Sequence, residues 1–393
     1  MRKNEWPLLV LILAVGVSFW NLTLPSPLQP YIAFSLGISL GAAAQLVTIS
    51  AGAMIGILLV YGLFGSRVSP KYVIWFGLAS LTFGSWLATT TDTYGALLAI
   101  RILNGFADGL IYPAAWVAIA NYLPRNRWAF GNQWILIGTA LSAIFGLPLA
   151  NTWAGGGDWQ SAFKWFTLAG ATMLLLSLTL AFAKEYPHKE VETGGFQTIW
   201  NNSYLRGLLL ANIFVAASWF GVVTFVGGFL VRTYQPTSSE VSWFFVCAGI
   251  AFTIGTFIFS ENRETQKKIA ITTGVLVIPL AFVFFWLTNG FWTTVAIASV
   301  YAFVRSPGLL AMETMLLHET ERAAARVPAI AAVDMVSALG TLIGAALGGI
   351  ILSEGTYAGI GVIFSASAAL SLFFLVRTNQ TSSNYVLIKP VHA

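Results

Sequence analysis

Apolar residues occur along most of the chain in runs of about twenty, separated by short polar segments. A run of that length, folded as a helix, crosses the roughly 30 Å hydrocarbon core of a bilayer. The pattern therefore predicts about twelve membrane-spanning helices. Their approximate limits are 6–26, 38–64, 71–90, 94–120, 128–150, 162–183, 204–231, 240–260, 268–288, 291–317, 326–352 and 357–377. The first run is interpreted as a retained span, because no small-residue cleavage site follows it.

The polar segments are unequal in charge. If the chain starts on the cytoplasmic side, sixteen of the twenty lysines and arginines lie in cytoplasmic segments, and only Lys164 and Arg232 lie on the opposite side. Basic residues concentrate on the cytoplasmic side of membrane proteins. The bias predicts an even number of spans with both termini in the cytoplasm.

The longest hydrophilic connection, 184–203, divides the chain into halves of similar length. The pattern of Gly138-Thr139 followed by Gly146 recurs 202 residues later as Gly340-Thr341 followed by Gly348. We therefore expect an all-α membrane protein whose two six-helix bundles are related by a pseudo-two-fold axis along the membrane normal. The expected parts are an N-terminal bundle, a cytoplasmic linker, a C-terminal bundle and a cytoplasmic tail, at 1–183, 184–203, 204–379 and 380–393.

One polar stripe interrupts the fourth apolar run. Arg101, Gly105, Asp108 and Tyr112 fall within about 40° of one another on a helix. An ionisable group facing lipid near the bilayer centre costs about 2.5 to 3.5 kcal/mol, so the stripe should face a protein interior or a watery cavity. Arg101 and Asp108 are about 10 Å apart along the axis, so each is expected to meet another partner.

Three further ionisable residues lie in predicted spans: Arg305, Glu313 and Asp334. Arg305 precedes Pro307, which predicts a kink in this helix, and stands at the position that repeats Arg101. Each charge has a structural interpretation, as a partner within the fold, and a functional one, in proton coupling or substrate binding. The sequence leaves both open, and it leaves the sign of the cavity open as well.

Composition excludes several classes of protein. Hydrophobic residues make up 57% of the chain and charged residues 9%, which is far from a soluble domain. The net charge of +5 reflects topogenic lysines and arginines, so no nucleic-acid partner is expected. The single Cys247 allows no internal disulfide. Neither a phosphate-binding loop nor a hydrolytic or metal-binding pattern is seen. We expect no enzyme activity, no metal and no cofactor.

Several motifs resemble those of the major facilitator superfamily, along the whole chain. The segment from Gly62 through Arg67 to Lys71 is similar to the loop signature between the second and third spans, with Ser66 where the family has aspartate. Arg101-x-x-Asn104-Gly105 resembles the fourth-span signature linked to proton coupling, and Gly146-Leu-Pro148 resembles the antiporter signature. The resemblance implies an alternating-access transporter in which Gly62, Arg67 and Lys71 form a gating loop.

The leading hypothesis is a proton-coupled exporter of small amphipathic or drug-like molecules. Protons would be carried through Asp108 with Arg101, and through Asp334 and Glu313. The candidate substrate contacts are polar or flat side chains on helices expected to face the cavity, namely Arg101, Asn104, Arg305, Asn21, Asn212 and Trp219. The expected partners are a small-molecule substrate, protons and the lipid bilayer. The expected state is a monomer in a bacterial or archaeal inner membrane.

Two other hypotheses stay open. In the first, the protein takes up a small organic anion or other metabolite, and Arg101 and Arg305 grip the anion from opposite halves. In the second, it is a transport-inactive sensor or scaffold, which is suggested by Ser66 in place of the family's aspartate.

Overall fold

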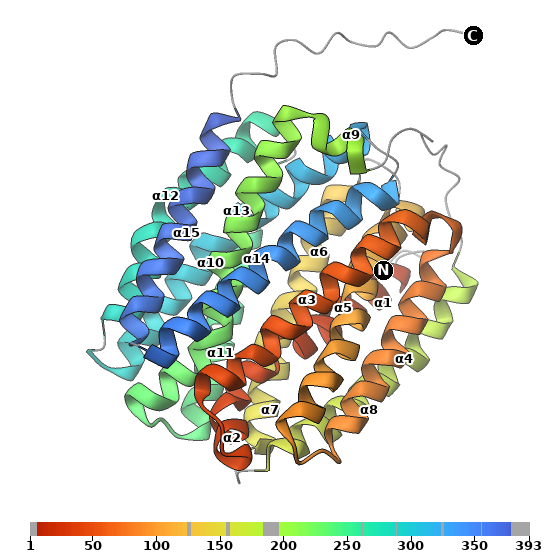
Figure 1. The fold of residues 1–393 in the computed structure, drawn as a ribbon. Coiled ribbons are helices and arrows are strands. Elements are labelled where there is room, and N and C mark those ends of the chain that lie inside the picture. The colour runs from red at the N-terminus through yellow and green to blue at the C-terminus, as the bar shows by residue number, and fades with distance from the viewer. Residues whose placement is uncertain are drawn as a thin grey trace, which may run out of the picture.

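The structure is a computed structural model that describes residues 6–123, 127–154, 158–183, 196–260, 262–287, 289–323, 326–354 and 356–378. Every regular element in these ranges is helical (Figure 1). The N-terminal half contains α1 (Trp6–Thr23), α2 (Pro25–Leu36), α3 (Leu40–Phe64), η1 (Gly65–Arg67), α4 (Pro70–Ala88), α5 (Tyr94–Tyr122), α6 (Trp128–Leu141), η3 (Ser142–Gly146), α7 (Leu147–Ala154), α8 (Trp159–Ser177) and η4 (Leu178–Phe182).

The C-terminal half contains α9 (Phe196–Asn201), α10 (Ser203–Tyr234), α11 (Ser238–Thr256), α12 (Arg263–Trp286), α13 (Phe291–Ala323), α14 (Arg326–Glu354) and α15 (Tyr357–Arg377). All twelve predicted spans coincide with helices of this set, so the expected all-helical fold is confirmed. Most of the predicted linker and tail, 184–195 and 379–393, lies outside the described residues, and the domain limits drawn from them remain a prediction.

Eleven of the described helical segments are long and apolar enough to cross a membrane, with α1 and α2 counted together. The helix α4 is not among them, although it occupies the predicted third span with 19 residues. Its exposed stripe is aromatic and comprises Tyr72, Phe76, Phe83 and Trp86. Tyrosine and tryptophan lower the mean hydropathy of a segment but suit membrane interfaces. Composition therefore explains why α4 looks less apolar than its neighbours.

Each half packs as a bundle. In the N-terminal half α5 contacts α1, α3 and α4, while in the C-terminal half α10 contacts α14 and α15, and α13 contacts α11 and α12. Across the halves, α3 packs along α14, α2 along α10 and α7 along α11. Figure 1 shows α3 and α14 lying side by side where the two halves meet. The cavity described below lies between the halves.

Glycines make the same helix contact in both halves. A Cβ at Gly138 would lie 2.5 Å from the carbonyl oxygen of Ile12 in α1, and a Cβ at Gly340 would clash with the carbonyl oxygen of Ile213 in α10. Small residues let helices in membranes approach closely. The α1–α6 contact is therefore repeated as the α10–α14 contact.

An aromatic ring packs against the next glycine of each repeat. The ring of Trp20 lies 2.7 Å from the position of a Cβ on Gly146, and the ring of Phe225 occupies the corresponding space over Gly348. The glycines that repeat in the sequence thus make similar packing contacts in the two halves. In the register set by Ile12 and Ile213, Phe225 lies one turn beyond the counterpart of Trp20, so the glycines correspond although the rings that cover them come from different positions.

Hydrogen bonds join the halves at both ends of the molecule. At the end that carries α2, Gln29 donates to the carbonyl oxygen of Thr224 at 2.8 Å, and Asn151 donates to that of Ser238 at 2.8 Å. At the end where α9 lies, Gln133 donates to the carbonyl oxygen of Thr256 at 3.3 Å. These bonds hold the halves around the space between them.

Candidate functional site

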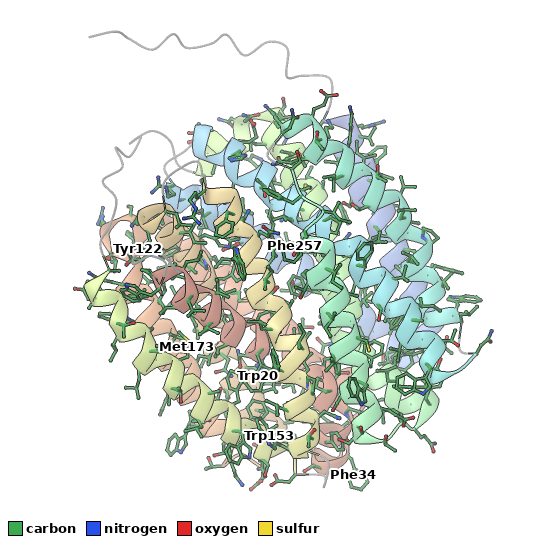
Figure 2. All side chains as sticks on the ribbon, turned by 180° about the vertical axis from the view of Figure 1, so that it is seen from behind. Trp20, Phe34, Tyr122, Trp153, Met173 and Phe257 are labelled. Carbon is green, nitrogen blue, oxygen red and sulfur yellow. The ribbon has the colours of Figure 1, made fainter. Side chains whose placement is uncertain are left out.

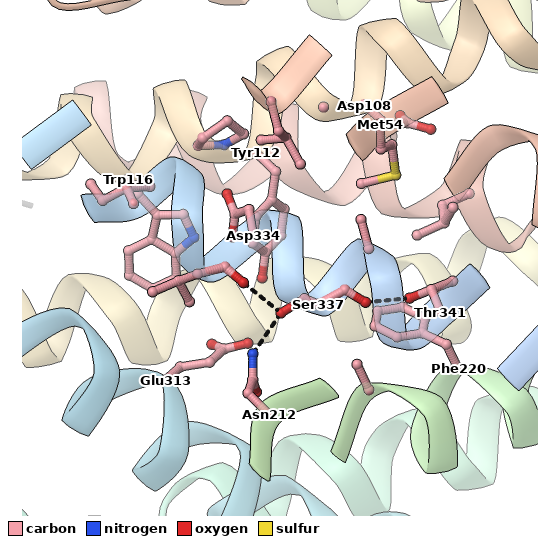
Figure 3. Close-up of a pocket in the computed structure, with 18 of the residues that line it drawn as sticks. Met54, Asp108, Tyr112, Trp116, Asn212, Phe220, Glu313, Asp334, Ser337 and Thr341 are labelled. Atoms are coloured by element: carbon pink, nitrogen blue, oxygen red, sulfur yellow. Dashed lines mark hydrogen bonds between the residues drawn. The ribbon is translucent and has the colours of Figure 1, made fainter. Parts of the chain in front are cut away.

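A cavity lies between the two halves and is lined by α1, α3 and α5 on one side and by α10, α13 and α14 on the other. It has a volume of about 920 Å³, which includes its opening to solvent. Three carboxylates belong to its lining: Asp108 from α5, Glu313 from α13 and Asp334 from α14 (Figure 3). Among the described residues that line it, none is lysine, arginine or histidine. The cavity is therefore acidic.

Arg101 lies behind the cavity wall, inside the N-terminal half. Its Nη1 donates to the carbonyl oxygen of Asn21 at 3.1 Å and to the Oδ1 of Asn21 at 3.2 Å. Its Nε donates to the carbonyl oxygen of Leu46 at 3.4 Å. The side chain has no exposed surface, and its Nη2 has no hydrogen-bond partner among the described residues. Arg101 thus ties α5 to α1 and α3 and does not reach the cavity lining.

Asp108 is held by hydrogen bonds from α1. The Oγ of Ser18 donates to its Oδ1 at 2.8 Å, and the Nδ2 of Asn21 donates to its Oδ2 at 2.7 Å. Asn21 therefore links the carboxylate to the Arg101 guanidinium through one amide group. Each charge meets a partner on another helix, in agreement with the spacing argument from the sequence. Ser18 precedes Asn21 by three residues and so shares its helix face, which is the signal that could have identified it.

Asn104 belongs to the same network. Its Nδ2 donates to the Oδ1 of Asn21 at 3.1 Å, and its side chain is fully buried. Asn21 and Asn104 were candidates for substrate contacts, but the structure does not bring them to the cavity lining. They lie one layer behind it, where Asn21 connects Arg101 to Asp108 and Asn104 donates to Asn21.

The carboxylates of the C-terminal half are less well satisfied. The Oε2 of Glu313 and the Oδ2 of Asp334 have no hydrogen-bond partner among the described residues. Asp334 is only 9% exposed. Figure 3 shows both side chains beside the same space as Tyr112 and Trp116. Burying an unpaired polar group is unfavourable, so this part of the cavity is suited to a cation.

Asn212 lines the cavity, as expected of a substrate contact. Its Nδ2 donates to the Oγ of Ser337 at 2.8 Å, and Ser337 donates in turn to the carbonyl oxygen of Val333 at 3.1 Å. This pair joins α10 to α14 beside Asp334 (Figure 3). Ser337 was not identified from the sequence, although it lies one turn after Asp334 on the same helix.

Arg305 does not face Arg101 across the cavity. One of its Nη atoms donates to the carbonyl oxygen of Val215, which is the kind of backbone contact that Arg101 makes. The side chain is buried, and it does not belong to the cavity lining. The structure therefore does not bring the two arginines together as a clamp for an anion.

A second, apolar pocket lies between α1, α6, η3 and the helices α10 to α13, with a volume of about 690 Å³ that includes its opening. Trp219 lines it and stacks on Phe252 and Tyr301, with ring centroids 5.3 Å and 6.0 Å away. Trp219 is therefore in contact with a cavity, as expected, but with an aromatic one. Figure 2 shows the molecule from behind, with Trp20 buried in the N-terminal half and Trp153 nearer its lower end. Trp20 packs on Phe166.

The expected gating loop lies at the end of α3. Gly62 is buried against the ring of Phe196 from α9, where a Cβ would clash. The Arg67 guanidinium lies over the Phe64 ring at 5.8 Å, and the Lys71 ammonium over the Tyr72 ring at 5.6 Å. Both basic side chains thus contact aromatic rings next to them in sequence. A Cβ on Gly62 would also lie 3.1 Å from the Cβ of Ala331 in α14, so this glycine lies close to an element of the other half.

The chain is similar in sequence to known transport proteins. The sequence model of the family described as "Major Facilitator Superfamily" matches residues 11–260. The chain is 25% identical to "Inner membrane transport protein YdhP" of Escherichia coli (strain K12), over 98% of this chain and 99% of that protein. It is 22% identical to "Probable sugar efflux transporter" of Helicobacter pylori (strain J99 / ATCC 700824), over 56% of this chain and 58% of that protein.

Proposed function

The chain belongs to the Major Facilitator Superfamily and is a membrane transporter, and on that basis we propose that it exports small amphipathic molecules in exchange for protons. The observation that carries the proposal is the position of Asp108. It is an ionisable group in the cavity wall, 2% exposed, and it is hydrogen-bonded to α1 of its own half. A relative from Helicobacter pylori is named as a probable efflux transporter, which supports the direction of transport. The protein acts as a monomer in a bacterial inner membrane, with both termini cytoplasmic.

Protonation of Asp108 changes its hydrogen bonds. As a carboxylate, it accepts from the hydroxyl of Ser18 and from the amide of Asn21. A protonated carboxyl must donate one bond. The Ser18 hydroxyl can rotate and accept this bond, while the Nδ2 of Asn21 can only donate. Taking up a proton therefore reverses the bond to Ser18 and leaves Asn21 donating to a neutral carboxyl, so both bonds lose the strength that the charge gave them.

The same proton changes the charge of the network. With Asp108 ionised, its negative charge lies near the positive charge of Arg101, and Asn21 bridges the two. With Asp108 protonated, the positive charge of Arg101 is left unbalanced. Charges in a membrane are unfavourable unless they are paired or hydrated. The two protonation states thus favour different arrangements of α1, α5 and the cavity, as an exchange cycle requires.

Uptake of an organic anion is less well supported. Both arginines that would grip the anion donate to backbone carbonyl oxygens, and neither lines the cavity. The charged groups that do line it are acids. An anion in this space would meet like charge.

The sensor hypothesis is tested by counterflow, since a protein that binds a ligand without moving it across the membrane gives no counterflow.

The test is proton-driven transport in proteoliposomes. Purified protein is reconstituted, a proton gradient is applied, and the export of an amphipathic fluorescent compound is followed for wild type and Asp108→Asn. We expect the gradient-driven rate to fall at least tenfold, because the asparagine cannot carry a proton. Glu264→Gln is the matched control, since Glu264 is exposed and pairs only with Lys268 at 2.8 Å in the same helix. An unchanged rate in Asp108→Asn would exclude the coupling role.

A further inference from the structure

The carboxylates of Glu313 and Asp334 form a feature that proton exchange at Asp108 does not use. They come from neighbouring helices, α13 and α14, and line the same side of the acidic cavity. Each has an oxygen with no hydrogen-bond partner among the described residues, and Asp334 is more than nine-tenths buried. Leaving such oxygens unpaired is unfavourable. The pair is therefore arranged to receive a group from outside the protein.

The surroundings of the pair indicate what that group is. Tyr112 and Trp116 from α5 line the cavity opposite α13 and α14 (Figure 3). The face of an aromatic ring attracts a cation, and tryptophan does so most strongly. Since the described lining has no basic side chain, the protein itself supplies no counter-charge there. A cation with weakly hydrated surface, such as a quaternary or protonated amine, fits both the acids and the rings.

The apolar pocket adjoins this acidic cavity. Phe19 belongs to the lining of both, and Trp219 and Phe220, which are consecutive in α10, line the apolar pocket and the acidic cavity respectively. The rings of Phe19 and Phe220 meet with centroids 5.9 Å apart. Two aromatic side chains, one from each half, thus stand between the two spaces. A rotation of either ring changes how far the spaces communicate.

We propose that the two spaces form one bipartite site for an amphipathic organic cation, with its charged head against Glu313 and Asp334 and its apolar tail in the pocket walled by Trp219. This inference rests on the proposed function and specifies its substrate class. Asp108 is left to carry the proton, because its oxygens already accept bonds from Ser18 and Asn21. The Phe19–Phe220 contact is the point at which the tail passes from one space to the other.

The test is ligand binding to purified protein in detergent, where no proton gradient exists. Butyl-, hexyl- and octyltrimethylammonium are titrated against the wild type, with 1-alkanols of the same tail lengths as uncharged controls, and binding is followed by tryptophan fluorescence. We expect Glu313→Gln and Asp334→Asn each to weaken binding of the ammonium ions at least tenfold and to leave the alcohols unchanged. Glu264→Gln is again the control for loss of one acidic charge.

The tail is tested by filling the apolar pocket. In wild type the affinity should rise by up to about fourfold for each added methylene, as expected for burial of apolar surface. Ala248 lines the pocket, and Ala248→Phe should flatten this rise for the hexyl and octyl compounds while butyltrimethylammonium binds as before. An unchanged dependence on tail length in Ala248→Phe would overturn the assignment of the pocket to the tail.

The head site has its own contradicting result. If the ammonium ions bind Glu313→Gln and Asp334→Asn as tightly as wild type, the bipartite site is wrong, whatever Asp108→Asn does to proton-driven transport. If an acid variant fails to fold, it loses the alcohols too, and Trp116→Leu then serves as the test of the same site. That variant should weaken ammonium binding severalfold and spare the alcohols, and equal affinity for the ammonium ions would overturn the proposal.

Discussion

The helices α5 and α13 occupy corresponding places in the two halves, and each carries an arginine followed two turns later by a carboxylate. In α5, Arg101 and Asp108 are both engaged, and Asn21 bridges them. In α13, Arg305 donates to a backbone carbonyl oxygen, while Glu313 keeps an oxygen without a partner among the described residues. The carboxylate follows the arginine by seven residues in α5 and by eight in α13, and it joins a hydrogen-bond network in one half and an open acidic surface in the other.

The difference originates in the helices that face them. In the register set by Ile12 and Ile213, which face the corresponding Gly138 and Gly340, Asn21 of α1 corresponds to Val222 of α10. Valine has no group that can join a guanidinium to a carboxylate. The C-terminal half therefore lacks the bridge, and its acids are left to the cavity. This comparison suggests that the N-terminal half carries the proton and that the C-terminal half binds the charged part of the substrate.

The largest expected effect comes from removing the bridge. Asn21→Leu takes away the shared partner of Arg101, Asn104 and Asp108. Breaking a buried charge network in this way costs about 3 to 5 kcal/mol, because both charges lose their compensation. The melting temperature of the purified protein should fall sharply. Asn212→Leu is the matched control in the other half, since it removes one neutral bond to Ser337 and should cost about 1 kcal/mol. Equal losses would contradict the comparison.

The glycine contacts should respond equally in both halves. Gly138→Ala and Gly340→Ala each place a methyl group against a backbone carbonyl oxygen of the facing helix. Such overpacking costs about 1 to 3 kcal/mol. Thermal unfolding in detergent measures it, and Gly56→Ala serves as control because a Cβ there meets no atom within 4 Å. If only one of the two variants were destabilised, the packing repeat would not extend to the energetics.

Replacing the two arginines, unlike replacing the two glycines, should reduce the stability of the protein by different amounts. Arg101→Lys loses a planar group that reaches acceptors on both α1 and α3, whereas Arg305→Lys loses a donor to a single carbonyl oxygen. We expect a loss of about 1 to 2 kcal/mol for Arg101→Lys and less for Arg305→Lys, measured by thermal unfolding. Neither change should alter the preference for charged over neutral ligands, since neither arginine lines the cavity. If Arg305→Lys reversed the preference for charged over neutral ligands, that result would support the hypothesis that Arg305 grips an anion.

The smallest effect is a gain in stability. Asp334→Asn removes a buried carboxylate that has an unpaired oxygen, so it should raise the stability of the ligand-free protein by about 1 kcal/mol. Asp108→Asn should lower it, because Asp108 accepts two hydrogen bonds as a carboxylate. Thermal unfolding of both variants at one pH shows whether each change raises or lowers the stability. Stabilisation by both would mean that the two acids are equivalent.

The sequence predicted the fold well because a bilayer imposes it. A helix that crosses hydrocarbon must satisfy its backbone groups internally and reach about 30 Å, so each of the twelve apolar runs coincides with helical structure. The polar stripe of α5 was predicted for the same reason. The apolar runs did not predict α2 (Pro25–Leu36), most of which lies between the first two predicted spans, or the division of the fifth span into α6, η3 and α7.

The site was only partly predictable, because a helix's rotation and its neighbours decide what a side chain faces. Asp108, Glu313, Asp334 and Asn212 line the cavity, while Arg101 and Arg305 donate to backbone carbonyl oxygens. Periodicity within one helix does not reveal which carbonyl oxygens a neighbouring helix presents. The acidic character of the cavity therefore emerged only when the helices were packed together.

The most direct test of the division between the halves is exchange without net proton movement. Vesicles loaded with unlabelled octyltrimethylammonium are placed in labelled compound at equal pH, and the uptake of label by counterflow is measured. We predict that Asp108→Asn keeps counterflow while losing gradient-driven export, and that the double variant Glu313→Gln, Asp334→Asn loses counterflow. Counterflow that survives in the double variant and disappears in Asp108→Asn would contradict the account.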